Sequence, residues 1–418
     1  MTGRLALGID VGTSGVRCAA LAPDGRLAAL ASADMSEAGD DRRVPATWQG
    51  ALELALERLR KEVSAREIGA LAVDATSGTV LALDVAGRVA GPVLMYNDPV
   101  NDAAILAAIA SAAPRETAGQ GANSGLARAL ALQNRSGIRR IVHQADWIAG
   151  LLAAAAVPSD ESNALKTGYD PVARRWPEWL ARTGLRTSLL PDVQPCGSEI
   201  GRTGGTFGLP AGIPLAAGVT DGCASFLATG AAQPGEGVTA LGTTLTIKLL
   251  SDHPIFAPEY GIYSHRIGDV WLAGGASNTG GGALAQHFTP QQIAHLSAEI
   301  DPMRDSGLDY YPLPKPGERF PVNDADLTPR VEPRPREDSA FLHGLLEGIA
   351  RIEAQGYGRL AELGAPALTS IRTVGGGAEN LVWQSMRERI LGVPAAEAAS
   401  DVAACGTARL ALPHLVRP

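Results

Sequence analysis

Aspartates that close short apolar runs and precede small polar turns are the residues of this sequence best suited to chemistry. Asp10 ends the run that begins at Leu5, and the turn Gly12–Gly15 (Gly-Thr-Ser-Gly) follows it directly. Backbone N–H groups of such a turn approach phosphate oxygens closely, hydroxyls add donors, and a carboxylate can hold Mg²⁺. The pattern indicates a metal-bound phosphate at this bend. An ordinary hairpin with a polar turn would use the same residues.

The second half of the chain repeats this arrangement. Residues 238–250 (VTALGTTLTIKLL) read as strand, turn and strand, with the bend at Gly242, Thr243 and Thr244. A third turn, Gly375–Gly377, follows the apolar residues 371–374 and contains no hydroxyl, so that a flat base could pack against its backbone. Glycine triplets also mark plain tight turns, but two Thr-containing turns could clamp one nucleotide.

Asp221 is the remaining candidate for chemistry. It follows a predicted buried strand over 215–219 and precedes a predicted helix over 223–229. A carboxylate in this place could accept a proton as a general base. Taken alone, a helix cap is the more ordinary interpretation.

Several other nucleotide sites are excluded. The sequence contains no GxxxxGK[ST] loop, no HRD or DFG kinase signature, and no GxGxxG fingerprint after its first strand. It is therefore neither a P-loop protein nor a protein kinase, and a Rossmann dehydrogenase is not indicated.

Composition points to a globular protein that does not bind nucleic acid. The 418 residues are 45% hydrophobic with a net charge of −8, and no run of Lys and Arg occurs. The four cysteines lie far apart without a CxxC pair, and no apolar run approaches 18 residues. These features predict no metal cluster of cysteines, no membrane partner and a cytoplasmic location.

The elements that position these turns alternate between strands and helices, which predicts an α/β fold with mixed sheets. The strand over 68–73 ends at Asp74, and an apolar strand over 92–96 leads into Asn97 and Asp98. Hydrophobic periodicity predicts further elements: a helix over 45–63, a strand pair at 80–85, mostly helix over 99–157, loop over 191–214, a strand over 270–273, loop over 302–335, a helix from Asp338 to Gly364, and a helix over 380–391.

Four segments in this order resemble the successive motifs of the FGGY carbohydrate kinases, which belong to a superfamily with Hsp70 and actin. They are IDVGTSGVR, GVTDGCAS, LGTTLTIK and VGGGAENLVWQSMRERILGVP, and the resemblance extends from Leu5 to about Leu412. It implies two actin-like (ribonuclease H-like) domains with mixed sheets flanked by helices and an active-site cleft between them. Residues 1–232 would bind sugar and phosphate and carry the catalytic base, and residues 233–418 would bind the nucleotide.

The resemblance also assigns roles, with ATP and Mg²⁺ as cofactors. Asp10 would hold Mg²⁺, Thr13 with the backbone of Gly12 and Ser14 would meet the γ-phosphate, and Asp221 would be the general base for the sugar hydroxyl. The remaining nucleotide contacts would come from the glycine turns and the helix behind them: Gly242, Thr243, Thr244, Gly281 with its neighbours 280 and 282, Gly375, Gly376, Gly377 and Asn380.

The sugar-binding positions implied by the family include Thr76, Ser77 and Gly78. Many xylulose kinases have Met-His-Gly where this chain has Thr-Ser-Gly. The change, the MYND segment and the chain length resemble instead a shorter group of ketopentose kinases, some called xylulose-kinase-like, whose members favour D-ribulose. Further sugar contacts are implied at Asn97, Asp98 and Asp221, and Asp160, Asn163 and Lys166 would line the pocket or serve only loop structure.

The expected function is MgATP-dependent phosphorylation of D-ribulose to D-ribulose 5-phosphate, with a small ketose as the partner. D-xylulose, another pentulose or a polyol are alternatives within the family. An actin- or Hsp70-like ATPase without sugar chemistry is the alternative outside it. Those relatives carry Asp-Gly-Gly-Gly-Thr at the second phosphate turn, where this chain has Ala240–Thr244.

Overall fold

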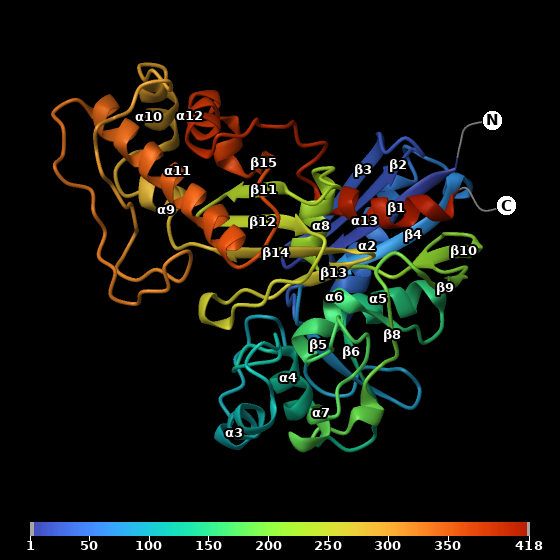
Figure 1. Cartoon of the computed structure of the whole chain (residues 1–418). Coiled ribbons are helices and arrows are strands. Elements are labelled where there is room, and N and C mark those ends of the chain that lie inside the picture. Colours follow the sequence, from blue (N-terminus) through green and yellow to red (C-terminus); the bar gives the residue numbers. More distant parts are fainter. Residues whose placement is uncertain (1–3, 416–418) are drawn as a thin grey trace. The chain divides into compact units, whose positions relative to one another are not determined.

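The computed structural model describes residues 4–415, which form two compact units, each mixed α/β as predicted (Figure 1). Unit 1 contains the residues up to Ala228, together with 265–269 and the chain from Val402 onward. Unit 2 contains 229–264 and 270–401. The predicted domain limit at 232–233 falls close to the division after Ala228. That prediction assigns the last helix to the second domain, whereas the helix packs into unit 1.

A six-stranded sheet forms the centre of unit 1, in the order β3-β2-β1-β4-β10-β9. β1, β4 and β10 are parallel, and the outer strands run antiparallel to their neighbours. The parallel strands end at one edge of the sheet, where ligands bind in folds of this kind. The strands are β1 (Leu5–Val11), β2 (Gly15–Leu21), β3 (Leu27–Asp34), β4 (Ile68–Ala75), β9 (Glu199–Gly204) and β10 (Ala211–Ala216).

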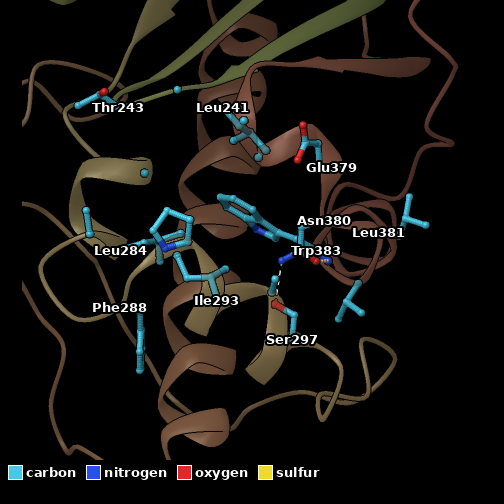
Figure 2. A pocket seen from close by; sticks show the side chains of 18 of the residues that line it. Leu241, Thr243, Leu284, Phe288, Ile293, Ser297, Glu379, Asn380, Leu381 and Trp383 are labelled. Carbon is cyan, nitrogen blue, oxygen red and sulfur yellow. Dashed lines mark hydrogen bonds between the residues drawn. The ribbon is translucent and has the colours of Figure 1, made fainter.

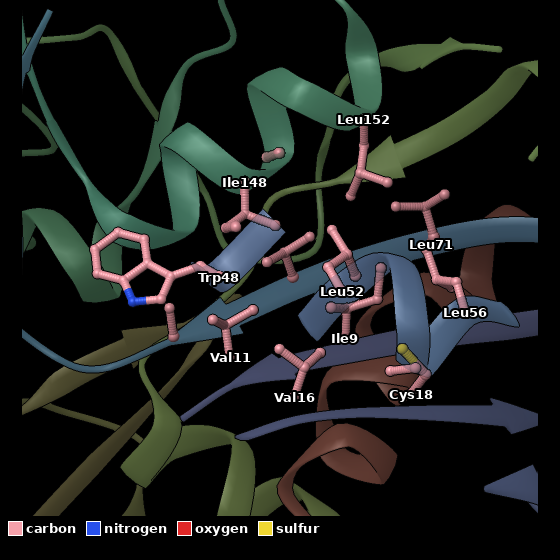
Figure 3. Packing of buried hydrophobic residues seen from close by; sticks show 14 of the residues in the cluster. Ile9, Val11, Val16, Cys18, Trp48, Leu52, Leu56, Leu71, Ile148 and Leu152 are labelled. Atoms are coloured by element: carbon pink, nitrogen blue, oxygen red, sulfur yellow. The ribbon is translucent and has the colours of Figure 1, made fainter. Parts of the chain in front are cut away.

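Successive side chains of β1 point to opposite faces of the sheet. Leu7, Ile9 and Val11 join a large apolar core with α2 (Pro45–Leu59) and α5 (Gln144–Ala153), as Figure 3 shows for several of its members. This core includes Trp48 of α2, which is 1% exposed and meets the edge of Trp147 at 5.9 Å between ring centroids. Burial of this face fixes the register of β1 and so turns Asp10 to the other side.

The opposite face of the sheet is covered closely by α13 (Ala403–Ala411). A Cβ placed on Gly8 would stand 1.9 Å from the carbonyl oxygen of Ala404, so only glycine allows this approach. Ala6 and Ala411 share a small apolar cluster on the same face. Small side chains thus bring the last helix directly against the strand that carries Asp10.

Shorter elements complete unit 1 around two small sheets, β5–β6 and β7–β8. Their strands are β5 (Val80–Asp84), β6 (Ile138–His143), β7 (Ser159–Asp160) and β8 (Val193–Gln194), and β13 (His265–Ile267) also belongs to unit 1. The helices are α1 (Met35–Ala38), α3 (Ala103–Ala112), α4 (Gly125–Leu132), α6 (Glu161–Ala164), α7 (Trp179–Arg182), α8 (Asp221–Ala228) and the 3₁₀ turns η1 (Ala65–Glu67), η2 (Leu165–Thr167), η3 (Thr187–Leu189) and η6 (Leu412–His414).

Unit 2 is built on the sheet β14-β12-β11-β15, in which β11 and β15 are parallel. Its strands are β11 (Glu236–Leu241), β12 (Leu245–Ser251), β14 (Val270–Ala276) and β15 (Ser370–Val374). Its helices are α9 (Gly281–Leu284), α10 (Pro290–Ser297), α11 (Asp338–Glu362), α12 (Leu381–Leu391) and the 3₁₀ turns η4 (Pro258–Tyr260) and η5 (Gly376–Glu379). Leu342, Leu345 and Ile349 of α11 belong to the apolar core of this unit.

Three expectations for unit 1 were wrong. Residues 92–96 form no strand and make only a bridge between Leu94 and Val80. The segment 99–157 is interrupted by β6, whose sequence Ile-Arg-Arg-Ile-Val-His suits a strand. The predicted loop 191–214 contains β8, β9 and most of β10. Pairing with β4 supports β10, which contains Gly and Pro and which local propensity alone does not favour.

Helix ends differ from the predictions by a few residues. α2 ends at Leu59 instead of 63, and α8 begins at Asp221 itself. Asp338 is the first residue of α11, and Glu337 takes the cap position. In the part of the chain that the structure describes, no helix is long and apolar enough to cross a membrane.

Candidate active site

Two aspartates lie side by side at the carboxyl edge of the unit 1 sheet. Asp10 on β1 and Asp74 on β4 are register partners across parallel strands, and both are buried. Burial raises the pKa of Asp74 well above its ordinary value, and the charge of Asp10 adds to this effect. The Thr407 hydroxyl of α13 donates to Asp74 and stabilises its charged form.

Arg17 places a positive charge beside Asp10. Arg17 lies opposite Asp10 on β2, and its Nη1 is 3.4 Å from Asp10 Oδ2. Burial raises the pKa of Asp10, Arg17 opposes the rise, and the charge of Asp221 adds to it. Asp221 is therefore close enough for its charge to be felt at both buried carboxyls. The sequence predicted Asp10 and Asp221 for this site but gave Asp74 no role, although it too closes an apolar strand.

Asp221 is held at the start of α8 by the segments beside it. Thr220 makes a parallel bridge with Ala75, just before the turn 76–78. Asp221 Oδ1 accepts a hydrogen bond from the Gly222 N–H at 2.7 Å. The loop after β10 and the turn after β4 consequently lie next to each other, which brings Asp221 to the same sheet edge as Asp10.

The predicted phosphate turn after β1 is tight and partly exposed. The Gly12 N–H donates to the Gly15 carbonyl at 3.0 Å, and the Met35 N–H donates to the Ser14 carbonyl at 2.9 Å. A Cβ on Gly15 would stand 2.6 Å from the Ala33 carbonyl oxygen, so neighbouring β3 requires glycine here. Thr13 and Ser14 remain partly or fully exposed at the bend, where an anion could reach them.

The residues at this edge fit a magnesium ion. Mg²⁺ prefers oxygen ligands and is usually held by one or two carboxylates plus substrate phosphates. Asp10, with Asp74 and Asp221 nearby, provides that chemistry, and Arg17 is the cation beside Asp10. Among residues 4–415, no group of three or more His, Cys, Asp or Glu side chains could enclose a metal by itself. Asp10 remains the proposed ligand.

A second site lies within unit 2, where the glycine turns lie together. Because β11 and β15 are parallel neighbours, the turns that follow them are adjacent. Gly375 has a φ of +86°, and a Cβ there would stand 2.9 Å from the Leu241 carbonyl oxygen. The Gly281 N–H donates to the Gly242 carbonyl at 2.8 Å. The Gly282 N–H donates to the Thr243 carbonyl at 2.9 Å, which joins the turn 280–282 to the turn 242–244.

These turns border a cavity of about 720 Å³, within the usual size of a small-ligand site (Figure 2). Six predicted nucleotide residues line it: Gly242, Thr243, Gly281, Gly376, Gly377 and Asn380. Thr244 and Gly375 belong to the same turns without lining the cavity. The structure thus gathers residues that lie more than 130 positions apart in the sequence.

The walls of this cavity come from residues that the sequence analysis did not identify. Apolar side chains dominate, from α9, α10 and α12 and the chain between them: Leu284, Phe288, Pro290, Ile293, Leu381, Val382 and Trp383. Glu379 is the charged residue among the described lining residues. A flat apolar group such as a nucleobase suits these walls. Thr289-Pro290 with Gln292 forms a capping box, and this local signal could have revealed α10.

The side chain of Asn380 makes hydrogen bonds to two helices that line the cavity. Its Oδ1 accepts the Trp383 N–H at 3.0 Å as the N-cap of α12, and its Nδ2 donates to Ser297 Oγ at 2.8 Å (Figure 2). The side chain therefore joins α10 to α12 at the wall of the cavity. A direct contact of Asn380 with a base stays a prediction.

The predicted sugar residues occupy the turn after β4 and the loop near 97. Thr76 is 3% exposed and its hydroxyl lies 2.5 Å from Gln144 Oε1. Both oxygens of Asp98 accept hydrogen bonds from Arg43 at 2.8 Å. Ser77 is half-buried and Asn97 is exposed, and neither side chain has a hydrogen bond within residues 4–415.

Two of the residues predicted either to line the sugar pocket or to serve only loop structure, Asp160 and Asn163, are bonded to each other and to the segment just before Asp221. Asn163 Nδ2 donates to Asp160 Oδ2 at 2.7 Å and to the Val219 carbonyl at 3.1 Å. Both side chains are buried. The half-buried Lys166 makes no ion pair or hydrogen bond in the described chain, and its Cδ lies 3.6 Å from the position of a Cβ on Gly78.

Comparisons with known proteins agree with this description. Residues 237–413 match the family model described as the FGGY family of carbohydrate kinases, C-terminal domain. A structure of a xyloylose kinase from Brucella ovis is 25% identical, with a TM-score of 0.84 over 99% of this chain and 90% of that chain. A xylulose kinase from Rhodospirillum rubrum (21%, TM-score 0.81, 97% and 89%) and Plasmodium falciparum glycerol kinase with ADP (15%, 0.81, 99% and 90%) share the fold.

Proposed function

We propose that the chain is a carbohydrate kinase of the FGGY family, whose C-terminal domain model matches residues 237–413, and that it phosphorylates a terminal hydroxyl of the small ketose D-ribulose with MgATP. The observation that carries the proposal is the group of Asp10, Asp74 and Asp221 at one sheet edge, next to the partly exposed turn 12–15. An acceptor hydroxyl needs a carboxylate base, and a phosphate needs donors and a cation.

Asp221 is the proposed general base. It stands at the start of α8, and its backbone neighbours hold it through the Gly222 N–H and the bridge between Thr220 and Ala75. Its carboxylate would accept the proton of the attacking hydroxyl as the bond to phosphorus forms and the bond to the leaving phosphate breaks. Phosphoryl transfer needs mainly positioning and charge stabilisation, which this fixed carboxylate provides.

Phosphate binding is proposed for the turn after β1. The N–H groups and hydroxyls of Thr13 and Ser14 would donate to phosphate oxygens, and Asp10 would hold the metal ion. Gly12, whose N–H bonds to the Gly15 carbonyl, would leave room for the phosphate to approach. When bound, Mg²⁺ would neutralise part of the phosphate charge. Arg17, paired with Asp10, limits the negative charge of the site until then.

Nucleotide binding is proposed for the unit 2 cavity. Its apolar walls suit the base, and the backbone N–H groups of Gly242 and Thr243 suit the phosphates, with Gly281 beside them. Gly376 and Gly377 would pack against the base. This arrangement supports ATP as the phosphoryl donor.

D-Ribulose is proposed on the basis of Thr76-Ser77-Gly78 in place of the Met-His-Gly of many xylulose kinases. D-Xylulose is the second candidate, supported by the similarity to the Brucella ovis protein. Coupled ADP release with MgATP should therefore be measured with D-ribulose, L-ribulose, D-xylulose, L-xylulose, erythrulose, glycerol and ribitol. The proposal expects the highest kcat/KM with D-ribulose.

Preference for another sugar would overturn D-ribulose as the proposed substrate but would still support the proposed kinase activity. ATP hydrolysis that no sugar changes would overturn sugar phosphorylation and favour an ATPase without an acceptor.

A further inference from the structure

A buried arginine joins the two loops that carry the proposed sugar contacts. Arg128 lies in α4 and is completely buried. Its guanidinium donates to the carbonyl oxygens of Gly78 (2.9 Å), Tyr96 (2.6 Å), Asn123 (3.0 Å) and Asp98 (3.2 Å). These four carbonyls belong to three separate loops.

The bonding of Arg128 makes it a constraint on those loops. Burial lowers the pKa of Arg128, and the nearby charge of Asp98 opposes this. A buried arginine that has no contact with water is stable only when hydrogen-bond acceptors surround the N–H groups of its planar guanidinium. The four carbonyls meet this need only while the turn after β4 keeps its place against the loop near Tyr96.

A second set of hydrogen bonds joins the same two loops. The Tyr96 N–H donates to Thr79 Oγ1 at 3.1 Å, and this hydroxyl lies 2.7 Å from Thr76 Oγ1. Arg43 then holds the carboxylate of Asp98, whose Oδ2 also accepts the Met95 N–H at 2.8 Å. The backbone of both loops is therefore fixed from inside the protein.

The same bonds decide which side chains stay available. Thr76 and Asp98 are engaged within the protein, whereas Ser77 and Asn97 have no hydrogen bond in the described chain. Ser77 directly precedes Gly78, and Asn97 stands between Tyr96 and Asp98, so each is next to a carbonyl that Arg128 holds.

We propose that Arg128 is a positioning residue for substrate: it fixes the turn 76–79 against the loop 95–98 so that Ser77 and Asn97 bind the hydroxyl groups of the ketose. This inference rests on the proposed sugar phosphorylation. Arg128 does not touch the sugar itself. Its effect should appear in sugar binding and leave nucleotide binding unchanged, because the proposed nucleotide cavity is lined by unit 2 residues alone.

The test compares Arg128→Lys and Arg128→Met with the wild-type protein, varying D-ribulose at saturating MgATP and then MgATP at saturating sugar. Lys has one compact ammonium and cannot reach four carbonyls, so Arg128→Lys should raise the KM for sugar roughly tenfold and Arg128→Met still more. The KM for ATP should change less than about twofold. Arg140→Met is the matched control, since Arg140 donates a hydrogen bond to the Val157 carbonyl and makes none to either loop within residues 4–415.

Hydrogen exchange of the substrate-free proteins provides a second measurement that does not depend on turnover. Amides in 76–79 and 95–98 should exchange faster in Arg128→Lys, while those of β1 and β11 should be unchanged. If Arg128→Met does not fold, the Lys variant and this measurement still decide.

An unchanged KM for sugar in an active Arg128→Lys variant would overturn the positioning role alone. The role would also be overturned if Arg128→Lys raised the KM for both sugar and ATP while its amide hydrogen exchange matched that of the wild-type protein in every segment. A wild-type protein that turns over no sugar would instead overturn the proposed function.

Discussion

Asp10 and Asp74 occupy equivalent positions on neighbouring parallel strands, so two buried carboxyls share one edge of the sheet. Each is preceded by an apolar run whose alternate residues pack on the opposite face. Thr407 of the last helix donates to Asp74, and Arg17 of β2 faces Asp10. Residues from both ends of the chain thus set the charge at this edge.

Replacing the proposed base should stop catalysis without removing nucleotide binding. Asp221→Asn keeps an acceptor for the Gly222 N–H but cannot accept the substrate proton, so kcat should fall by about 10²–10⁴-fold. Coupled ADP release and ATP titration by calorimetry would measure the two effects. Asp102→Asn, at an exposed helix cap, is the control and should retain activity. Turnover near the wild-type rate in Asp221→Asn would exclude this base.

Substitutions at two adjacent glycines should affect different properties: one should weaken nucleotide binding and the other should lower folding stability. A Cβ on Gly376 meets no protein atom within 4 Å, so Gly376→Ala should fold normally while its methyl group enters the cavity and raises the KM for ATP several-fold. A Cβ on Gly377 would stand 2.6 Å from Leu241 Cβ, so Gly377→Ala should lose about 1–3 kcal/mol of stability.

Gly358→Ala on the exposed side of α11 has equally free space and is the control for Gly376. Kinetics and urea unfolding would be measured for all three variants. An unchanged KM for ATP in Gly376→Ala would contradict the assignment of the cavity to the nucleotide.

Asp160 should make folding stability depend on pH. Burial and the charge of Asp146 raise its pKa from 3.8 to about 6, while Asn163 and the His143 ring oppose the rise. Because the folded state binds this proton more tightly, the stabilisation is complete below pH 3.8 and is lost as pH rises to about 6. Two pKa units correspond to roughly 3 kcal/mol.

Asp160→Asn removes this titration. The difference in unfolding free energy between wild type and Asp160→Asn, measured by urea denaturation from pH 4 to 7, should shift in favour of the variant as pH rises. Glu62→Gln, an exposed carboxylate, is the control and should show a smaller change. A difference that stays constant from pH 4 to 7 would contradict the prediction.

A buried ion pair should support the strands that lead to the unit 2 cavity. Arg387 of α12 binds both oxygens of Glu353 of α11 at 2.6 and 2.7 Å and donates to Thr373 on β15. Arg387→Met leaves a buried carboxylate without a cation and should cost about 3–5 kcal/mol in urea unfolding.

The double variant Glu353→Leu with Arg387→Met should recover most of that loss, because an apolar pair needs no counter-charge. A double variant that is less stable than Arg387→Met alone would show that the loss comes from packing and not from the uncompensated charge.

The local sequence pattern was sufficient to locate the turns that are proposed to bind phosphate and nucleotide. Asp10, the turns at 242–244 and 375–377, and the strands before them were predicted because strand ends and glycine turns are local features that a few residues determine. The mixed α/β fold was likewise predicted correctly from the alternation of strands and helices, and the structure confirms it.

Partners distant in sequence were decided only by the tertiary structure. The sequence near Asp98 does not indicate that Arg43 donates hydrogen bonds to both of its carboxylate oxygens. The sequence near Asn380 likewise does not indicate its hydrogen bond to Ser297. Arg128 occurs within an ordinary alanine-rich helix, where its four acceptors cannot be recognised. A residue's type determines which bonds it can form, but packing of distant segments determines which bonds it does form, and so which side chains remain available for substrate.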